Sequence, residues 1–188
     1  MLSWFKGSSG RARGALALSL LLGTTPLAQA QVGSDSGLPI PRFVSIKSGE
    51  ANVRVGPGRD FRVDWVFTRK GLPVEIVAEF DNWRRIRDAD GTEGWIFGAL
   101  LSGRRTAVVA PWLAGEGDPA NAEASALTLR RGPSAESRPV ARLGAGVLGT
   151  IEECNGEWCR FQPGEAHVSG WLRQVELWGV YPGEAFED

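Results

Sequence analysis

The 188-residue chain carries 21 basic and 22 acidic side chains, so its formal net charge at pH 7 is −1. It lacks the strong basic excess that favours binding to nucleic acid or to an anionic membrane, and we expect neither partner. The length suits one ordinary domain or two very small ones, and it excludes a large multidomain enzyme.

Residues 1–30 have the pattern of a secretory signal peptide. A basic start precedes an apolar run at 15–22, and the sequence AQA (28–30) offers the small residues that signal peptidase needs. The apolar run is shorter than the roughly 20 residues of a membrane-spanning helix, and no cysteine near the cleavage site can take a lipid. We therefore expect a periplasmic protein that begins at Gln31 and has no membrane anchor after cleavage.

The rest of the chain contains a repeat. Three pairs of segments match in the same order at offsets of 75 or 76 residues: NVRVGPG (52–58) with TLRRGPS (128–134), NWRRI (82–86) with EWCRF (157–161), and GWI (94–96) with GWL (170–172). This pattern predicts two copies of one small module, at residues 42–104 and 105–188. We expect a flexible segment at 31–41 and an inserted loop at about 112–125.

Each copy is predicted to consist of strands. Short apolar or alternating runs, such as FVSI (43–46), LPVEIVAEF (72–80) and GWIFGALL (94–101), are separated by Gly, Pro, Asp and Asn. The Asp-Gly pair in DADGTEG (88–94) is typical of a hairpin. We expect an all-β protein of two small five-stranded barrels, because a barrel removes the open sheet edges that invite aggregation.

The Gly-Pro motif in each copy is interpreted as a turn. A phosphate-binding loop needs consecutive backbone N–H donors at the start of a helix. Pro57 has no N–H, the second copy reads Gly132-Pro133-Ser134, and strands follow in both copies. Arg54 and Arg130 precede the two turns at equivalent positions, and we expect each to tie its loop down through hydrogen bonds to carbonyl groups.

The order Asn/Thr-aliphatic-Arg, Gly-Pro, a Trp-containing strand and Gly-Trp-aliphatic resembles the bacterial SH3-like domains. The resemblance covers both copies and implies a pair of five-stranded barrels that serve as binding modules, often for cell-wall peptide or a partner protein. It implies no catalysis, because the hydrolases that carry such domains use a separate domain with a Cys and a His. The single mature-chain tyrosine, Tyr181, disfavours proline-rich ligands.

The only two cysteines, Cys154 and Cys159, flank four residues, and in an exported chain this spacing favours a disulfide across a hairpin. Two reduced, packed cysteines are the alternative. The offset of 75 places Glu79 and Arg84 at the same positions of the first copy. We predict an ion pair between them, one module using charge where the other uses a covalent bond.

The candidate ligand-binding residues lie in the first module. In a regular strand Trp83, Arg85 and Arg87 share the outer face, where an indole beside two guanidinium groups suits a peptide with a carboxylate. Arg59 and Asp60 lie at the tip of the loop after the Gly-Pro turn. The alternative is that the arginines pair with Asp81, Asp88 or the acidic second module.

No catalytic residues, metal ligands or cofactor are predicted. His167 is the only histidine, and two cysteines with one histidine fall short of a zinc site unless carboxylates help. The sequence predicts a non-catalytic periplasmic module for cell-wall peptide or an envelope protein. A structural or regulatory protein that docks to an envelope enzyme is the alternative, and an enzyme of unrecognised type is the third. Opposite net charges of the two copies favour contact between them.

Overall fold

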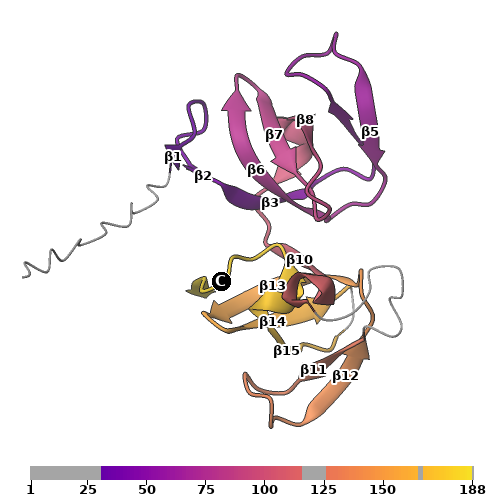
Figure 1. Cartoon of the computed structure of the whole chain (residues 1–188), viewed down its shortest axis with the longest axis vertical. Coiled ribbons are helices and arrows are strands. Elements are labelled where there is room, and N and C mark those ends of the chain that lie inside the picture. The colour runs from indigo at the N-terminus through magenta and orange to yellow at the C-terminus, as the bar shows by residue number, and fades with distance from the viewer. Residues whose placement is uncertain (1–30, 116–125, 165–166, 188) are drawn as a thin grey trace, which may run out of the picture.

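The structure is a computed structural model that describes residues 31–115, 126–164 and 167–187 (Figure 1). The predicted signal peptide and most of the predicted inserted loop lie outside these residues. The described part is all-β, as predicted, and contains only three short 3₁₀ helices: η1 (Gly98–Leu100), η2 (Pro111–Ala114) and η3 (Gln174–Glu176). No helix in the described ranges is long and apolar enough to cross a membrane.

The first module is an antiparallel sheet in the order β5-β4-β8-β7-β6-β3-β9. Its strands are β3 (Arg42–Ile46), β4 (Ala51–Arg54), β5 (Val63–Phe67), β6 (Pro73–Phe80), β7 (Trp83–Arg87), β8 (Glu93–Phe97) and β9 (Leu101–Ser102). Strand segments exceed the expected five because the chain after the Gly-Pro turn doubles back as β5, and β9 pairs with the start of the module at β3.

The second module repeats this topology in the order β12-β11-β15-β14-β13-β10-β16. Its strands are β10 (Thr106–Val109), β11 (Leu127–Arg130), β12 (Pro139–Leu143), β13 (Leu148–Asn155), β14 (Trp158–Pro163), β15 (Gly170–Arg173) and β16 (Leu177–Trp178). A further strand, β17 (Ala185–Glu187), pairs with β13. The two sheets lie one above the other and are joined by a single connection (Figure 1).

The register of the strands confirms the repeat in detail. Strand β4 shifts register against β5 between Val53 and Arg54, and β11 shifts against β12 between Leu129 and Arg130. The hairpins β6–β7 and β13–β14 also contain matching irregularities, after Ile76 and after Ile151. A bulge re-aims the side chains that follow it, so conserving its position keeps the same residues of each module on the same face.

Each module has its own apolar core at equivalent positions. Val53, Ile76, Ile86 and Ile96 are buried in the first core, and Leu129, Ile151, Phe161 and Leu172 are buried in the second. The glycine of each Gly-Trp motif allows two strands to approach closely. A Cβ at Gly94 would lie 2.5 Å from the Val53 side chain, and one at Gly170 would lie 2.5 Å from the Arg130 carbonyl oxygen.

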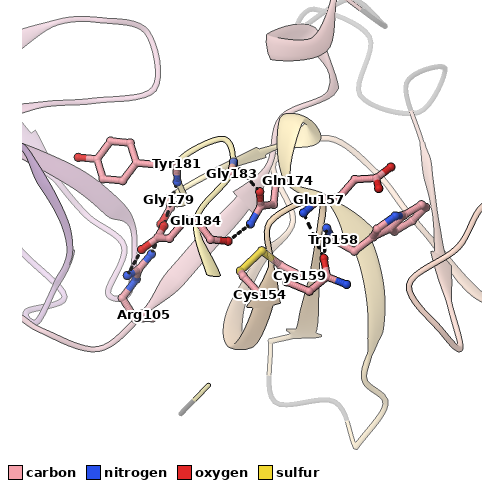
Figure 2. The surroundings of a disulfide bond; sticks show 11 residues. Arg105, Cys154, Glu157, Trp158, Cys159, Gln174, Gly179, Tyr181, Gly183 and Glu184 are labelled. Atoms are coloured by element: carbon pink, nitrogen blue, oxygen red, sulfur yellow. Dashed lines mark hydrogen bonds and ion pairs between the residues drawn. A yellow bond between two sulfur atoms is a disulfide. The ribbon is translucent and has the colours of Figure 1, made fainter. Parts of the chain in front are cut away.

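The disulfide between Cys154 and Cys159 is present, as predicted, at the end of the β13–β14 hairpin (Figure 2). Asn155 Oδ1 closes the turn by accepting hydrogen bonds from the backbone N–H groups of Glu157 and Trp158. Gln174 links this region to the C-terminal segment, since its amide donates to Glu184 O and accepts from Gly183 N. The disulfide therefore lies among the contacts that hold the end of the chain.

Reduction of this disulfide is expected to lower the free energy of unfolding of the second module by about 2 kcal/mol, because the loop it closes is short. Urea unfolding with and without a thiol reductant measures the loss. The first module contains no cysteine and is the internal control. Equal unfolding midpoints of the second module in both conditions would contradict the expectation.

Residues 31–41, for which the sequence predicts a flexible segment, contain a hairpin of β1 (Gln31–Val32) and β2 (Pro39–Ile40). Hydrogen bonds to Glu79 fix the turn between β1 and β2. The Glu79 carboxylate accepts hydrogen bonds from Asp35 N at 3.1 Å and from Ser36 N at 2.9 Å and Ser36 Oγ at 2.6 Å. The buried Glu79 carboxylate is thus hydrogen-bonded to protein donors rather than to water, and these bonds hold the β1–β2 hairpin on β6.

The predicted pairing of Glu79 with Arg84 is present, with Arg84 Nε 3.4 Å from Glu79 Oε1, and the two residues face each other as the cysteines do. The pair is buried, because the side chains of Arg84 and Glu79 are 15% and 0% exposed. Arg42 Nη2 is the closer cation, at 2.8 Å. The Glu79 ion pairs therefore link the three strands β3, β6 and β7, whereas the disulfide links only β13 and β14.

The two modules contact each other through aromatic rings and hydrogen bonds. Phe43 of β3 lies with its ring centroid 5.0 Å from that of Trp178 and 4.7 Å from that of Tyr181. Trp178 Nε1 donates to Pro73 O at 3.1 Å, and Thr106 Oγ1 donates to Gly71 O at 2.7 Å. The contact that we expected from opposite net charges is therefore made largely by apolar packing and neutral donors.

Candidate functional site

The loops after the two Gly-Pro turns are tied down by arginine, as predicted. Arg54 Nη1 donates to Phe61 O at 2.6 Å, and Arg130 Nη1 donates to Ser137 O at 3.0 Å. Within each turn the second residue after the first glycine donates its N–H back to that glycine's carbonyl, at 3.0 Å in the first module and 2.9 Å in the second. These loops are built as tight turns that fix the residues beyond them.

The first loop leads to a groove on the first module, which we call the Trp83 groove. It has a volume of about 280 Å³ and is lined by Asn52, Arg54, Arg59, Trp83, Phe97 and Leu100. Trp83 and Phe97 come from the neighbouring strands β7 and β8, where they face each other in register. Their rings pack edge to face with centroids 5.7 Å apart, and Trp83 is only 8% exposed. The indole is a wall of the groove rather than an open platform.

The Trp83 groove combines aromatic walls with positive charge. The Arg59 guanidinium lies 5.9 Å from the Phe97 ring centroid, a geometry in which cation and ring attract each other. The Arg54 guanidinium also lines the groove, and no lining residue is a carboxylate. Such a groove suits a ligand that offers a carboxylate to the guanidinium groups and an apolar group to the rings.

The second module has a groove of about 320 Å³ at the equivalent place. Thr128, Arg130 and Trp158 occupy the positions of Asn52, Arg54 and Trp83. The remaining positions differ, because Ala135, Arg173 and Glu176 stand where the first module has Arg59, Phe97 and Leu100. The second groove lacks the paired aromatic rings and contains a carboxylate, so the two grooves differ in chemistry.

The structure does not bring the predicted group of Trp83, Arg85 and Arg87 together as a free binding face. Arg85 Nη2 lies 2.8 Å from Glu93 Oε2, and Arg87 Nη2 lies 2.6 Å from Glu75 Oε2. Both guanidinium groups are therefore paired with carboxylates, as the alternative interpretation proposed, although with different partners. Glu75 also accepts a hydrogen bond from Tyr181 Oη at 2.8 Å, which links Arg87 to the second module.

The other predicted residues have different outcomes. Arg59 lines the groove with Trp83, whereas Asp60 is exposed and does not line it. His167 is exposed in a loop. Within the described ranges, no cluster of three or more His, Cys, Asp or Glu side chains is arranged to hold a metal ion.

Sequence reasoning did not identify four of the groove residues, Asn52, Arg54, Phe97 and Leu100, as part of a binding site. Phe97 follows Gly94-Trp95-Ile96 on the same strand, and alternation along that strand places it with Trp95 on the face opposite the buried Ile96. The alternation was therefore a usable signal for Phe97. Leu100 lies in the 3₁₀ helix that follows, where strand alternation gives no information.

Comparison with known proteins identifies the repeated unit. Residues 47–103 and 123–179 each match the sequence model of the bacterial SH3 domain. The chain is also similar to two solved structures from Trichomonas vaginalis, NlpC2 and NlpC1, each at 12% sequence identity and a TM-score of 0.32. The matches cover 73% and 78% of this chain and 48% of each of those chains, so this chain spans about half their length. No curated protein matches it.

Proposed function

Since the chain belongs to the bacterial SH3 domain family, of which it carries two copies, we propose that it is a non-catalytic binding protein of the cell envelope. Its ligand in this proposal is a cell-wall peptide, held in the Trp83 groove. Export through the predicted signal peptide places the protein where that ligand occurs, and the disulfide fits an oxidising compartment.

The observation that carries the proposal is the composition of the Trp83 groove. Two guanidinium groups and two aromatic rings line it without any carboxylate. Cell-wall peptides carry free carboxylates and small apolar side chains, which match those two kinds of wall. Arg54 is already fixed by its bond to Phe61 O, whereas Arg59 is exposed at the loop tip, so Arg59 is the residue we assign to the ligand carboxylate.

Replacing Arg59 with alanine is expected to weaken binding of a soluble cell-wall tetrapeptide about tenfold, the equivalent of about 1.4 kcal/mol for one charge-assisted contact. Calorimetric titration of the purified protein measures the affinity, and a peptide amidated at its carboxylates is expected to lose a similar factor. Arg62→Ala is the matched control, because Arg62 belongs to the same loop, pairs with Asp64 at 2.9 Å and does not line the groove.

Equal affinities of the wild type and the Arg59→Ala variant would remove the Trp83 groove from the proposal. An equal loss of tetrapeptide affinity in the Arg62→Ala variant would show that the Arg59→Ala effect comes from the general loss of positive charge. Both variants change exposed side chains, so both are expected to fold.

A second candidate function is docking to an envelope enzyme or complex, and one observation favours it. A groove of about 550 Å³ lies between the modules, and its walls include Phe43, Leu113, Val175, Trp178, Tyr181 and Pro182. Leu113 and Val175 are large apolar side chains that are 44% and 38% exposed. Crosslinking of a defined envelope protein to the wild type, lost in Val175→Asp while tetrapeptide binding persists, would favour this function.

A further inference from the structure

Besides the apolar groove of about 550 Å³ described above, another groove lies between the two modules, and its charged lining residues are cations. It has a volume of about 510 Å³, and we call it the junction groove. The first module and the connection contribute Ser45, Ile46, Lys47, Lys70, Gly71, Ser102 and Arg104, and the second module contributes Thr106, Leu148, Gly149, Thr150 and Gly164. It shares no residue with the Trp83 groove, so what it binds is a separate question from the proposed function.

The charged residues that line the junction groove are all cations, namely Lys47, Lys70 and Arg104. Within the described residues none of these three is paired with a carboxylate. Elsewhere in the described residues, seven arginines form ion pairs with carboxylates: Arg42, Arg62, Arg84, Arg85, Arg87, Arg105 and Arg160. In a chain of net charge −1, three uncompensated cations around one groove create a local field that attracts anions.

The walls of the junction groove are held in place by hydrogen bonds. Arg104 Nη2 donates to Thr150 Oγ1 at 3.0 Å, which extends this side chain from the connection to β13. Thr106 Oγ1 donates to Gly71 O at 2.7 Å across the module boundary. Gly71 adopts a φ of +86° and faces Leu148, which a Cβ at Gly71 would approach to 3.3 Å. Both modules must therefore be docked for the groove to exist.

We propose that the junction groove binds a small polyanion, a molecule with two or more neighbouring phosphate or carboxylate groups. Lys47 and Lys70 supply point charges, and Arg104 keeps donors beyond the one used on Thr150. A ligand with a single negative charge leaves most of the positive field uncompensated, which is why the groove selects a polyanion. Because both modules form the walls, the bound ligand stabilises their docked arrangement.

The test is an NMR titration of the purified protein with pyrophosphate, citrate and acetate at constant ionic strength. Pyrophosphate or citrate is expected to give saturable shifts of the backbone amides of Gly71, Gly149 and Thr150, at about tenfold lower concentration than acetate. Tighter binding of pyrophosphate identifies phosphate as the preferred group, and tighter binding of citrate identifies carboxylate. Either preference supports the polyanion site.

The double variant Lys47→Ala/Lys70→Ala is expected to weaken this binding at least about tenfold. The control Arg131→Ala/Arg138→Ala removes the same charge from two exposed arginines outside the groove and is expected to bind like the wild type. Shifts that stay linear in the wild type, or an equal loss in the control, would overturn the proposal. The Arg59→Ala variant keeps the junction groove intact, so failure here is distinguishable from failure of tetrapeptide binding.

Discussion

Replacing Glu79 with alanine is expected to lower the free energy of unfolding of the first module by about 3 kcal/mol. The Glu79 side chain is fully buried. Its carboxylate forms ion pairs with Arg42 and Arg84 and accepts hydrogen bonds from the turn of the β1–β2 hairpin. Removing it leaves the Arg42 guanidinium and two backbone N–H groups without their acceptor. Urea unfolding followed by tryptophan fluorescence measures the loss.

The matched control is Glu93→Ala, which removes a carboxylate from the more exposed pair with Arg85. That pair is 49% and 30% exposed at its two side chains, so its loss is expected to change stability by less than about 1 kcal/mol. Equal effects of the two variants would contradict the buried anchor at Glu79.

The same carboxylate makes the stability of the first module sensitive to acid. Burial opposes ionisation of Glu79, but the hydrogen bonds from Ser36, Arg42 and Asp35 outweigh it and lower the pKa from 4.5 to about 2. A carboxyl group whose pKa is lower in the folded state stabilises the fold above its unfolded pKa. This contribution is lost as the pH falls from about 4.5 to about 2, and after screening by solvent we expect it to be about 2 kcal/mol. Glu79→Gln is expected to abolish this part of the pH dependence.

Replacing Trp178 with alanine is expected to separate the two modules and to lower stability by about 3 kcal/mol. The indole packs edge to face on Phe43 and donates to Pro73 O, so the substitution removes the ring and the hydrogen bond at once. NMR relaxation of the wild type is expected to give one rotational correlation time for both modules. In the variant each module is expected to tumble faster and independently.

Trp178→Phe is the informative companion variant. It keeps an aromatic ring against Phe43 and loses only the donor to Pro73 O, so the modules are expected to stay docked with a loss of about 1 kcal/mol. Independent tumbling of the modules already in the wild type would contradict the rigid junction. It would also contradict the existence of both grooves between the modules, including the junction groove.

The repeat made the internal structure of each module predictable from sequence. An offset of 75 residues placed Glu79 and Arg84 across a hairpin because Cys154 and Cys159 face each other there, and strand pairing gives both pairs the same register. The tethering roles of Arg54 and Arg130 followed in the same way. Such predictions succeed because strand register transfers from one copy to the other.

Contacts specific to one copy were not predictable in this way. The partners of Glu79 in the β1–β2 hairpin have no counterpart in the repeat. Phe43 and Trp178 pack at the junction, but the equivalent strand positions of the other copy carry Thr106 and Ser102 and no aromatic ring. Alternation placed Trp83 on the outer face of its strand, but the Phe97 ring that covers it comes from a neighbouring strand. The burial of Trp83 and the pairing of Arg85 and Arg87 depend on such neighbours, which a pattern along one strand does not contain.

The most direct test of the proposed function is co-sedimentation of the purified protein with peptidoglycan sacculi, beside the Arg59→Ala and Arg62→Ala variants. Saturable binding by the wild type and the Arg62→Ala variant, weakened about tenfold in Arg59→Ala, is the predicted result. Binding that is absent in the wild type, or equal in all three proteins, would contradict recognition of cell-wall peptide by the Trp83 groove.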